Sequence, residues 1–203
     1  MPSRNVSKID VPDSYYHVYA RGASRKTIFI EDEDFNYFIS LFHRYLSHDE
    51  VTNSINVPYE KLHDDIELLS YCLMGNHFHL LLYQSEQGTM ARLMRGIMTS
   101  YSRYFNKKYE LSGSLFETRY KASRISNDEY LMHISRYIHL NPDKWERYPY
   151  SSIAYYRDEK APDWLHTERI LELFSSPNAY MEFVKDYKDI RDVYEVVKHE
   201  LAN

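Results

Sequence analysis

The sequence of 203 residues contains a single cysteine, Cys72, and no long apolar run. One cysteine excludes an internal disulfide framework and any zinc site built from several cysteines. Without a run of about 18 apolar residues we expect no membrane span. The first 22 residues also lack the apolar segment of a secretory signal peptide. We therefore expect a cytoplasmic protein, in which a hydrophobic content of 43% supports one well-packed core.

Positive charge is scarce overall, since 25 Lys and Arg residues stand against 30 Asp and Glu residues. The distribution is nevertheless uneven. Residues 27–67 hold ten acids against two basic residues, whereas residues 92–124 hold eight basic residues against two acids. An approaching phosphate responds to local charge, so the basic stretch keeps nucleic acid open as a partner. The alternative is that this charge run is an ordinary solvated helix face.

The order of the predicted elements indicates an α+β fold. Apolar residues alternate where strands are expected and recur every three or four residues where helices are expected. The pattern is that of a ferredoxin-like split βαβ antiparallel sheet with an added helix and a C-terminal helical extension. The predicted elements are strand 14–22, helix 34–48, loop 49–65, strands 66–74 and 77–84, helix 89–109, strand 118–125, and a helix that begins after a capping-box residue at Ser126 and ends before Pro142.

The stretch "MGNHFHLLL", residues 74–82, places two histidines inside an apolar strand. Side chains alternate along a strand, so His77 and His79 point to one face and Phe78 to the other. Two imidazoles about 7 Å apart along a strand can converge on one metal ion. The alternative, which the motif alone favours, is a pair of structural histidines with satisfied hydrogen bonds.

The last predicted helix carries a polar face that these histidines could meet. Tyr130, Ile134, Tyr137 and Asn141 follow at spacings of four, three and four, so they share one side of the helix. Tyr137 and Asn141 would bring a hydroxyl and an amide oxygen to the histidines if this side packs on the sheet. Equally, Tyr137 can be a core aromatic and Asn141 a helix-stop residue, because the following proline disfavours a helical backbone there.

Four stretches of the chain together form a recognisable pattern. With these stretches, which cover about residues 14–150, the sequence resembles the IS200/IS605-like single-tyrosine (Y1) transposases of the HUH endonuclease class. It looks most like their REP-associated branch. The stretches are "YYHVYARG", "LMGNHFHLLL", "YSRYFNKKYELSGSLFETRYKAS" and "YLMHISRYIHLNP".

The resemblance assigns roles to four residues. It implies that Tyr137 is the catalytic nucleophile and that His77 and His79 are metal ligands. Asn141 falls where the family places a third, amide-type ligand, which is often glutamine. The implied ion is Mg²⁺ or Mn²⁺, although two imidazoles by themselves suit manganese or zinc better than magnesium.

Two other tyrosines compete with Tyr137 for the role of nucleophile. Tyr101 and Tyr104 lie on the preceding predicted helix, beside the basic residues. Neither has a carboxamide four residues later, where Phe105 and Lys108 stand. We therefore rank both below Tyr137.

The resemblance implies a metal-dependent single-stranded DNA endonuclease and strand transferase, a transposase that forms a covalent 5′-phosphotyrosine intermediate. Retention of the phosphoester bond removes the need for ATP, and the sequence has no Gly-rich Walker loop. The alternative is a non-catalytic DNA-binding derivative, domesticated or inactivated, that kept the fold. A third class is a metal-binding protein that acts on RNA or small phosphodiesters.

The expected partner is single-stranded DNA, in the resembling family with a hairpin near the cut. Residues 1–155 form the predicted transposase/nuclease domain, and residues 156–203 a helical tail packed on it. The resemblance leaves both a monomer and a homodimer open. Phosphate contacts give affinity without sequence information, and the residues expected to make them are Arg21, Arg25, Arg92, Arg95, Arg103, Arg119, Lys121 and Arg124.

Overall fold

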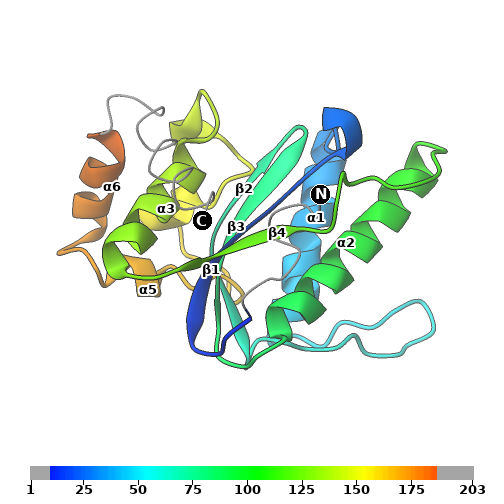
Figure 1. The fold of residues 1–203 in the computed structure, drawn as a ribbon, viewed down its shortest axis with the longest axis horizontal. Helices are drawn as coiled ribbons and strands as arrows, with labels where there is room; N and C mark the ends of the chain where they lie inside the picture. The colour runs from blue at the N-terminus through cyan, green and yellow to red at the C-terminus, as the bar shows by residue number, and fades with distance from the viewer. Residues whose placement is uncertain (1–9, 187–203) are drawn as a thin grey trace, which may run out of the picture.

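The computed structural model describes residues 10–186 (Figure 1). Its centre is one sheet in which every neighbouring pair of strands is antiparallel, in the order β2-β3-β1-β4. This order, together with the helices that follow the first and third strands, confirms the predicted ferredoxin-like architecture. The strands are β1 (Ser14–Arg21), β2 (Ile66–Met74), β3 (His77–Gln84) and β4 (Lys121–Ile125).

Helices α1 (Asp32–Leu46) and α2 (Thr89–Lys108) cover one face of the sheet. Their apolar stripes meet alternate strand residues such as Val18 and Leu80, which are fully buried. The buried carboxylate of Asp34 accepts a hydrogen bond from the backbone N–H of Ile30 at 2.8 Å, just before α1 begins. It also lies 3.0 Å from the Lys108 ammonium at the end of α2, which pairs with Glu33 of α1 as well, so these ion pairs join the two helices.

Helix α3 (Asp128–Leu140) covers the opposite face of the sheet, together with α4 (Ile153–Arg157), α5 (Glu168–Leu171) and α6 (Pro177–Lys185) (Figure 1). The capping residue of α3 is Asn127, whose side-chain oxygen accepts from the Tyr130 N–H at 2.8 Å. The predicted cap at Ser126 was therefore wrong by one residue. A carboxamide oxygen and a hydroxyl can both cap a helix, and the local backbone selected the former.

The segments after α3 share its buried core. Tyr156 of α4 and Tyr180 of α6 are almost completely buried in the cluster that α3 builds on the sheet. His139 connects α3 with α6 and with the start of α4. Its Nδ1 lies 2.6 Å from the Tyr180 hydroxyl, and its Nε2 lies 2.7 Å from the Ser152 hydroxyl. The predicted boundary at residue 155 falls inside α4. The part of the predicted tail beyond residue 186 lies outside the described residues.

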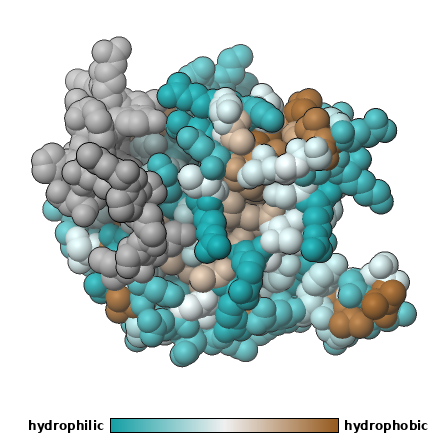
Figure 2. Space-filling model, turned by 45° about the vertical axis from the view of Figure 1, so that its right-hand side comes forward, coloured by the Kyte–Doolittle hydropathy of each residue, from teal (hydrophilic) through white to brown (hydrophobic). Residues whose placement is uncertain are grey.

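The predicted loop 49–65 projects from the body of the molecule as an extended arm (Figure 1). A single bridge between Thr52 and Pro58 pairs its two branches. Ile55 and Val57 expose 75% and 50% of their surfaces near its end, and Figure 2 shows a hydrophobic tip on a lobe that stands apart from the body.

Short 3₁₀ turns occupy Ala23–Arg25 and Trp145–Arg147. In residues 10–186, no helix has the length and apolar character needed to cross a membrane.

Candidate active site

Pairing of β1 with β3 brings a third histidine to the predicted pair. The register sets Tyr19 opposite His79 and Arg21 opposite His77. His17 lies on the same face, and its Nε2 is 2.9 Å from Nδ1 of His79. The sequence analysis missed His17. The available signal was the alternation of His17, Tyr19 and Arg21 in "YYHVYARG", but their proximity to the β3 histidines depends on a register that the sequence does not specify.

The Tyr137 ring packs against this histidine pair. Its centroid lies 5.3 Å from that of His79 and 5.8 Å from that of His17, and both contacts are edge-on. Helix α3 places the ring there because Tyr137 is on the side of the helix that faces the sheet. The side chain is 5% exposed, and His79 is equally well covered, whereas His77 is half-buried.

Asn141 completes the group in spite of the proline that follows it. Pro142 disfavours a helical backbone at Asn141, which left the direction of its side chain open, but the backbone there is helical, with φ −57° and ψ −43°. Its side chain therefore stays one turn after Tyr137, and Nδ2 donates to the Tyr137 carbonyl oxygen at 2.9 Å. The same side chain forms a hydrogen bond with His77 that raises the pKa of that imidazole. The structure thus brings His77, Asn141 and Tyr137 together.

Each predicted ligand histidine is held through its Nδ1. In His77, Nδ1 lies 2.6 Å from Oδ1 of Asn76. An amide oxygen can only accept, so His77 carries its proton on Nδ1 and keeps a lone pair on Nε2. In His79, Nδ1 faces Nε2 of His17. Histidines that bind metal ions are typically oriented by such a hydrogen bond at their other ring nitrogen.

Burial keeps all three imidazoles neutral. It lowers the pKa of His17 to about 3. The pKa of His79 lies well below its usual range, first through burial and then through the neighbouring His17, His77 and Arg21. The pKa of His77 is lowered by burial and by Arg21, against the effect of Asn141. Neutral imidazoles at pH 7 offer lone pairs, which is the form that binds metal ions.

The donor set fits a divalent ion only if the amide takes part. Among residues 10–186, no group of three or more His, Cys, Asp or Glu side chains is arranged to hold a metal ion. His77 and His79 would supply two nitrogen donors, and the oxygen of Asn141 would supply a third, since its amide nitrogen donates to the Tyr137 carbonyl oxygen. Two nitrogens and one neutral oxygen suit manganese or zinc better than calcium.

The competing tyrosines lie in the other layer of the protein. The Tyr101 hydroxyl donates to the Ile28 carbonyl oxygen, and burial raises the pKa of Tyr101 strongly. The Tyr104 hydroxyl donates to Asp34 at 3.1 Å. Both side chains belong to the α1–α2 face, so the sheet separates them from His77 and His79.

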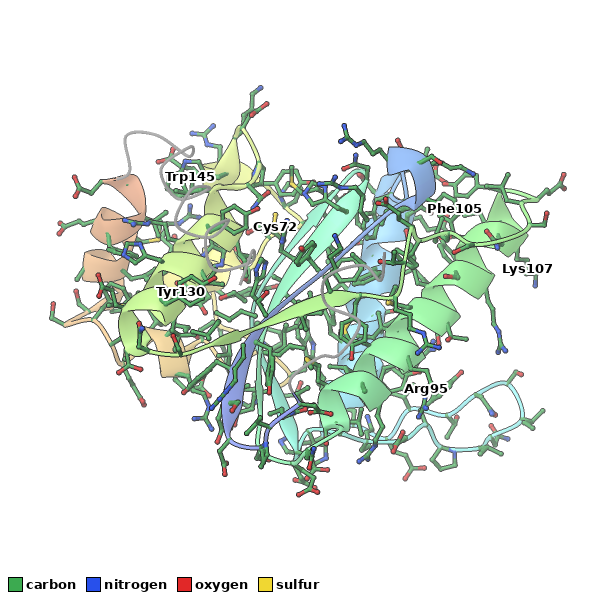
Figure 3. All side chains as sticks on the ribbon, in the orientation of Figure 1. Cys72, Arg95, Phe105, Lys107, Tyr130 and Trp145 are labelled. Carbon is green, nitrogen blue, oxygen red and sulfur yellow. The ribbon has the colours of Figure 1, made fainter. Side chains whose placement is uncertain are left out.

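The predicted DNA-contact residues divide between two faces. Arg21 and Lys121 lie at the end of β1 and the start of β4, beside the histidines. The α2 residues lie on the opposite side of the sheet from α3, as the positions of Arg95 and Tyr130 show in Figure 3. Two of the other predicted residues have partners within the protein: Arg92 pairs with Glu60 at 2.7 Å, and Arg124 donates to the Ser14 hydroxyl at 3.1 Å. The others are exposed, namely Arg25, Arg95, Arg103 and Arg119.

Comparison with known proteins identifies the family and the fold. The family model described as "Transposase IS200 like" matches residues 10–141, and the chain belongs to this family. The fold is shared with the structure of a REP-associated tyrosine transposase bound to a REP hairpin, with a TM-score of 0.52 and 14% identity over 74% of this chain and 82% of that one. A candidate transposase of Deinococcus radiodurans R1 gives a TM-score of 0.40 and 15% identity over 68% and 95% of the two chains. No curated protein matches this chain.

Proposed function

We propose that this transposase cleaves and rejoins single-stranded DNA through a covalent bond between Tyr137 and a 5′ phosphate. One observation carries the proposal: Tyr137 from α3 packs against His79, while Asn141 from the same helix contacts His77. Tyr137 and Asn141 follow the two histidines by 58 or more positions and meet them only through the docking of α3 on the sheet. A buried cluster of neutral imidazoles beside a tyrosine has no evident value for stability alone.

The reaction follows from the residue types. The Tyr137 oxygen forms a bond to the scissile phosphorus, the bond from phosphorus to the 3′ oxygen breaks, and the phenolic proton passes through solvent to that 3′ oxygen. A free 3′-OH and a phosphotyrosine result. The energy of the phosphodiester is retained, so the reverse attack by a 3′-OH rejoins DNA without ATP.

The residues that would hold a metal ion are His77, His79 and Asn141. A divalent ion supplies charge that stabilises the developing negative charge on the phosphate oxygens. The chain itself orients these donors, because Asn76 fixes the proton of His77 and His17 engages His79. Arg21, beside both ligands, adds positive charge at the point where a phosphate would approach.

Single-stranded DNA that contains a hairpin is the proposed substrate. The REP-associated tyrosine transposase that shares the fold was solved with a REP hairpin bound to it. In the present chain the exposed cations Arg21 and Lys121 flank the site, and the exposed arginines of α2 form a second basic surface behind the sheet. The single strand would approach the first surface, and the hairpin stem would lie along the second.

A denaturing-gel assay tests the proposal. The full chain is incubated with labelled single-stranded DNA carrying a hairpin, in Mn²⁺ or Mg²⁺, and we expect an adduct that survives denaturation and maps to Tyr137. Tyr137→Phe keeps the aromatic packing and should give no adduct, whereas Tyr104→Phe is the matched control and should react normally. An adduct of undiminished yield in Tyr137→Phe would remove that residue from the role.

The burial of Tyr137 favours a second candidate. Tyr137 is 5% exposed, so little of its surface is open to DNA in this arrangement. A DNA-binding derivative without catalytic activity would tolerate such burial. Salt-dependent DNA binding without an adduct in any divalent ion would support this candidate over the catalytic one.

A further inference from the structure

A small cleft opens beside the candidate active site, at the end of β1. Its volume is about 170 Å³, which is below the roughly 300–1,000 Å³ typical of pockets for whole small molecules. It can therefore take one ring-sized group. Six residues line it: Tyr19, Ala20, Arg21, Glu117, Thr118 and Lys121. None of the roles given above to Tyr137 and its partners uses Tyr19, Glu117 or Thr118.

The cleft begins one strand away from the histidines. Tyr19 and Arg21 are the cross-strand partners of His79 and His77, respectively. The Tyr19 ring lies nearly parallel to the His79 ring, with the centroids 5.7 Å apart. A group bound in the cleft would thus sit next to a phosphate held at His77 and His79. We propose that the cleft binds the base of a nucleotide that adjoins the scissile phosphate, an inference that rests on the function proposed above.

Tyr19 provides the surface on which a base would stack. The ring is half-buried, and the ammonium group of Lys121 lies 5.7 Å from its centroid. An exposed cation–π contact of this kind changes an equilibrium constant about two- to fivefold, whereas stacking of a base on an aromatic side chain changes binding about 5- to 150-fold. A base therefore displaces the flexible Lys121 side chain, which is then free to contact a phosphate together with Arg21.

The polar edge of the cleft is rich in acceptors, which bears on the identity of the base. Glu117 contributes a carboxylate. The Thr118 hydroxyl donates to the Arg119 carbonyl oxygen at 2.7 Å, so towards the cleft it can only accept. Acceptors of this kind bind the exocyclic amino groups of cytosine, adenine or guanine. Thymine has no amino group and offers a single N3–H donor between two carbonyl oxygens, so it pairs less well with two acceptors.

Abasic substitution tests this inference on the full chain. A series of cleavable oligonucleotides carries one abasic site at each position near the scissile phosphate, and adduct formation is measured for wild type, Tyr19→Phe and Tyr19→Leu. We expect one position whose abasic form reacts about 5- to 150-fold less efficiently with wild type and Tyr19→Phe. Tyr19→Leu keeps an apolar side chain of similar bulk against His79. With intact DNA its adduct formation should fall by a similar factor, and an abasic site at the sensitive position should lower it no further.

Glu117→Gln tests the base preference. An amide can donate as well as accept, so at the sensitive position this variant should discriminate less against thymine than wild type does. In one outcome, wild type forms an adduct while every abasic site lowers adduct formation equally in wild type and in Tyr19→Leu. That result refutes the subsite and leaves the proposed function standing. If wild type forms no adduct with any intact oligonucleotide, the proposed function fails, and fluorescence binding of the same series then decides whether Tyr19 stacks on a base.

Discussion

Nε2 of His17 on β1 lies 2.9 Å from Nδ1 of His79 on β3, in a position where His17 is completely buried. Nδ1 of His17 has no hydrogen-bond partner among residues 10–186. If His79 binds an ion through Nε2, as proposed, its proton would reside on Nδ1 and be donated to His17. His17 would then fix the tautomer and the orientation of His79.

Replacement of His17 should weaken metal binding, although His17 is not one of the proposed ligands. Glutamine places an acceptor near the position of the imidazole Nε2, whereas leucine leaves Nδ1 of His79 unpaired. Loss of such an orienting partner typically lowers metal affinity about 10- to 100-fold. We expect this loss for His17→Leu and a much smaller one for His17→Gln, measured by electron paramagnetic resonance of Mn²⁺ without DNA. Equal affinities of the two variants would contradict a positioning role.

Asn141→Ala should lower Mn²⁺ affinity at least tenfold, or about 1.4 kcal/mol, because it removes the only oxygen donor of the proposed set. Single-stranded DNA binding in a chelator should stay near the wild-type level, since that affinity comes from phosphate contacts. Asn76→Ala is a useful comparison, because it removes the partner of His77 but no ligand. Wild-type Mn²⁺ affinity in Asn141→Ala would leave two histidines as the whole protein donor set.

Arg21 and Arg95 should respond differently to the length of the DNA. Arg21 lies at the end of β1, opposite His77, whereas Arg95 lies on α2, which covers the face of the sheet away from α3. For a short single strand spanning the cleavage site, Arg21→Ala should reduce the salt dependence by about 0.7 in the log–log slope, as for one lost phosphate contact. Arg95→Ala should change the slope only when the hairpin stem is included. An effect of Arg95→Ala on the short strand would place that strand on α2.

His139 should contribute to acid sensitivity. Burial lowers the pKa of His139 to about 3, whereas the unfolded chain titrates near 6.5. Between these values the unfolded state binds one more proton. The free energy of unfolding therefore falls as the pH falls below 6.5, by about 1.4 kcal/mol per pH unit for this group.

His139→Gln removes that titration, and it also perturbs the bonds to Tyr180 and Ser152. We expect the variant to have a lower free energy of unfolding at pH 7. Between pH 6 and 4.5 its free energy of unfolding should fall less steeply than that of wild type, by the amount that corresponds to about one proton. Urea unfolding in a chelator measures both quantities. His17, with a similarly lowered pKa, remains in the variant, so part of the wild-type slope should persist. Identical slopes would mean that another group carries the effect.

The sequence by itself determined the kind, order and approximate extent of the elements. Periodicity located the two strands that flank Gly75 and Asn76, and β2 and β3 have the predicted bounds. It also placed Tyr137 and Asn141 on one side of a helix, because a fixed rise and turn decide which residues share a helix face. Local propensity was less informative at the ends of elements, where it indicated Ser126 instead of Asn127 as the cap and left the conformation of Asn141 open.

Only the tertiary structure decided which of these faces meet. The antiparallel register of β1 on β3 sets His17 beside His79 and Arg21 beside His77, and a slip of one residue would turn these side chains to the opposite face. The docking of α3 on one face and of α2 on the other then separates Tyr137 from Tyr101. Such contacts depend on how distant segments bury their apolar faces together, and local sequence patterns do not encode that partner choice.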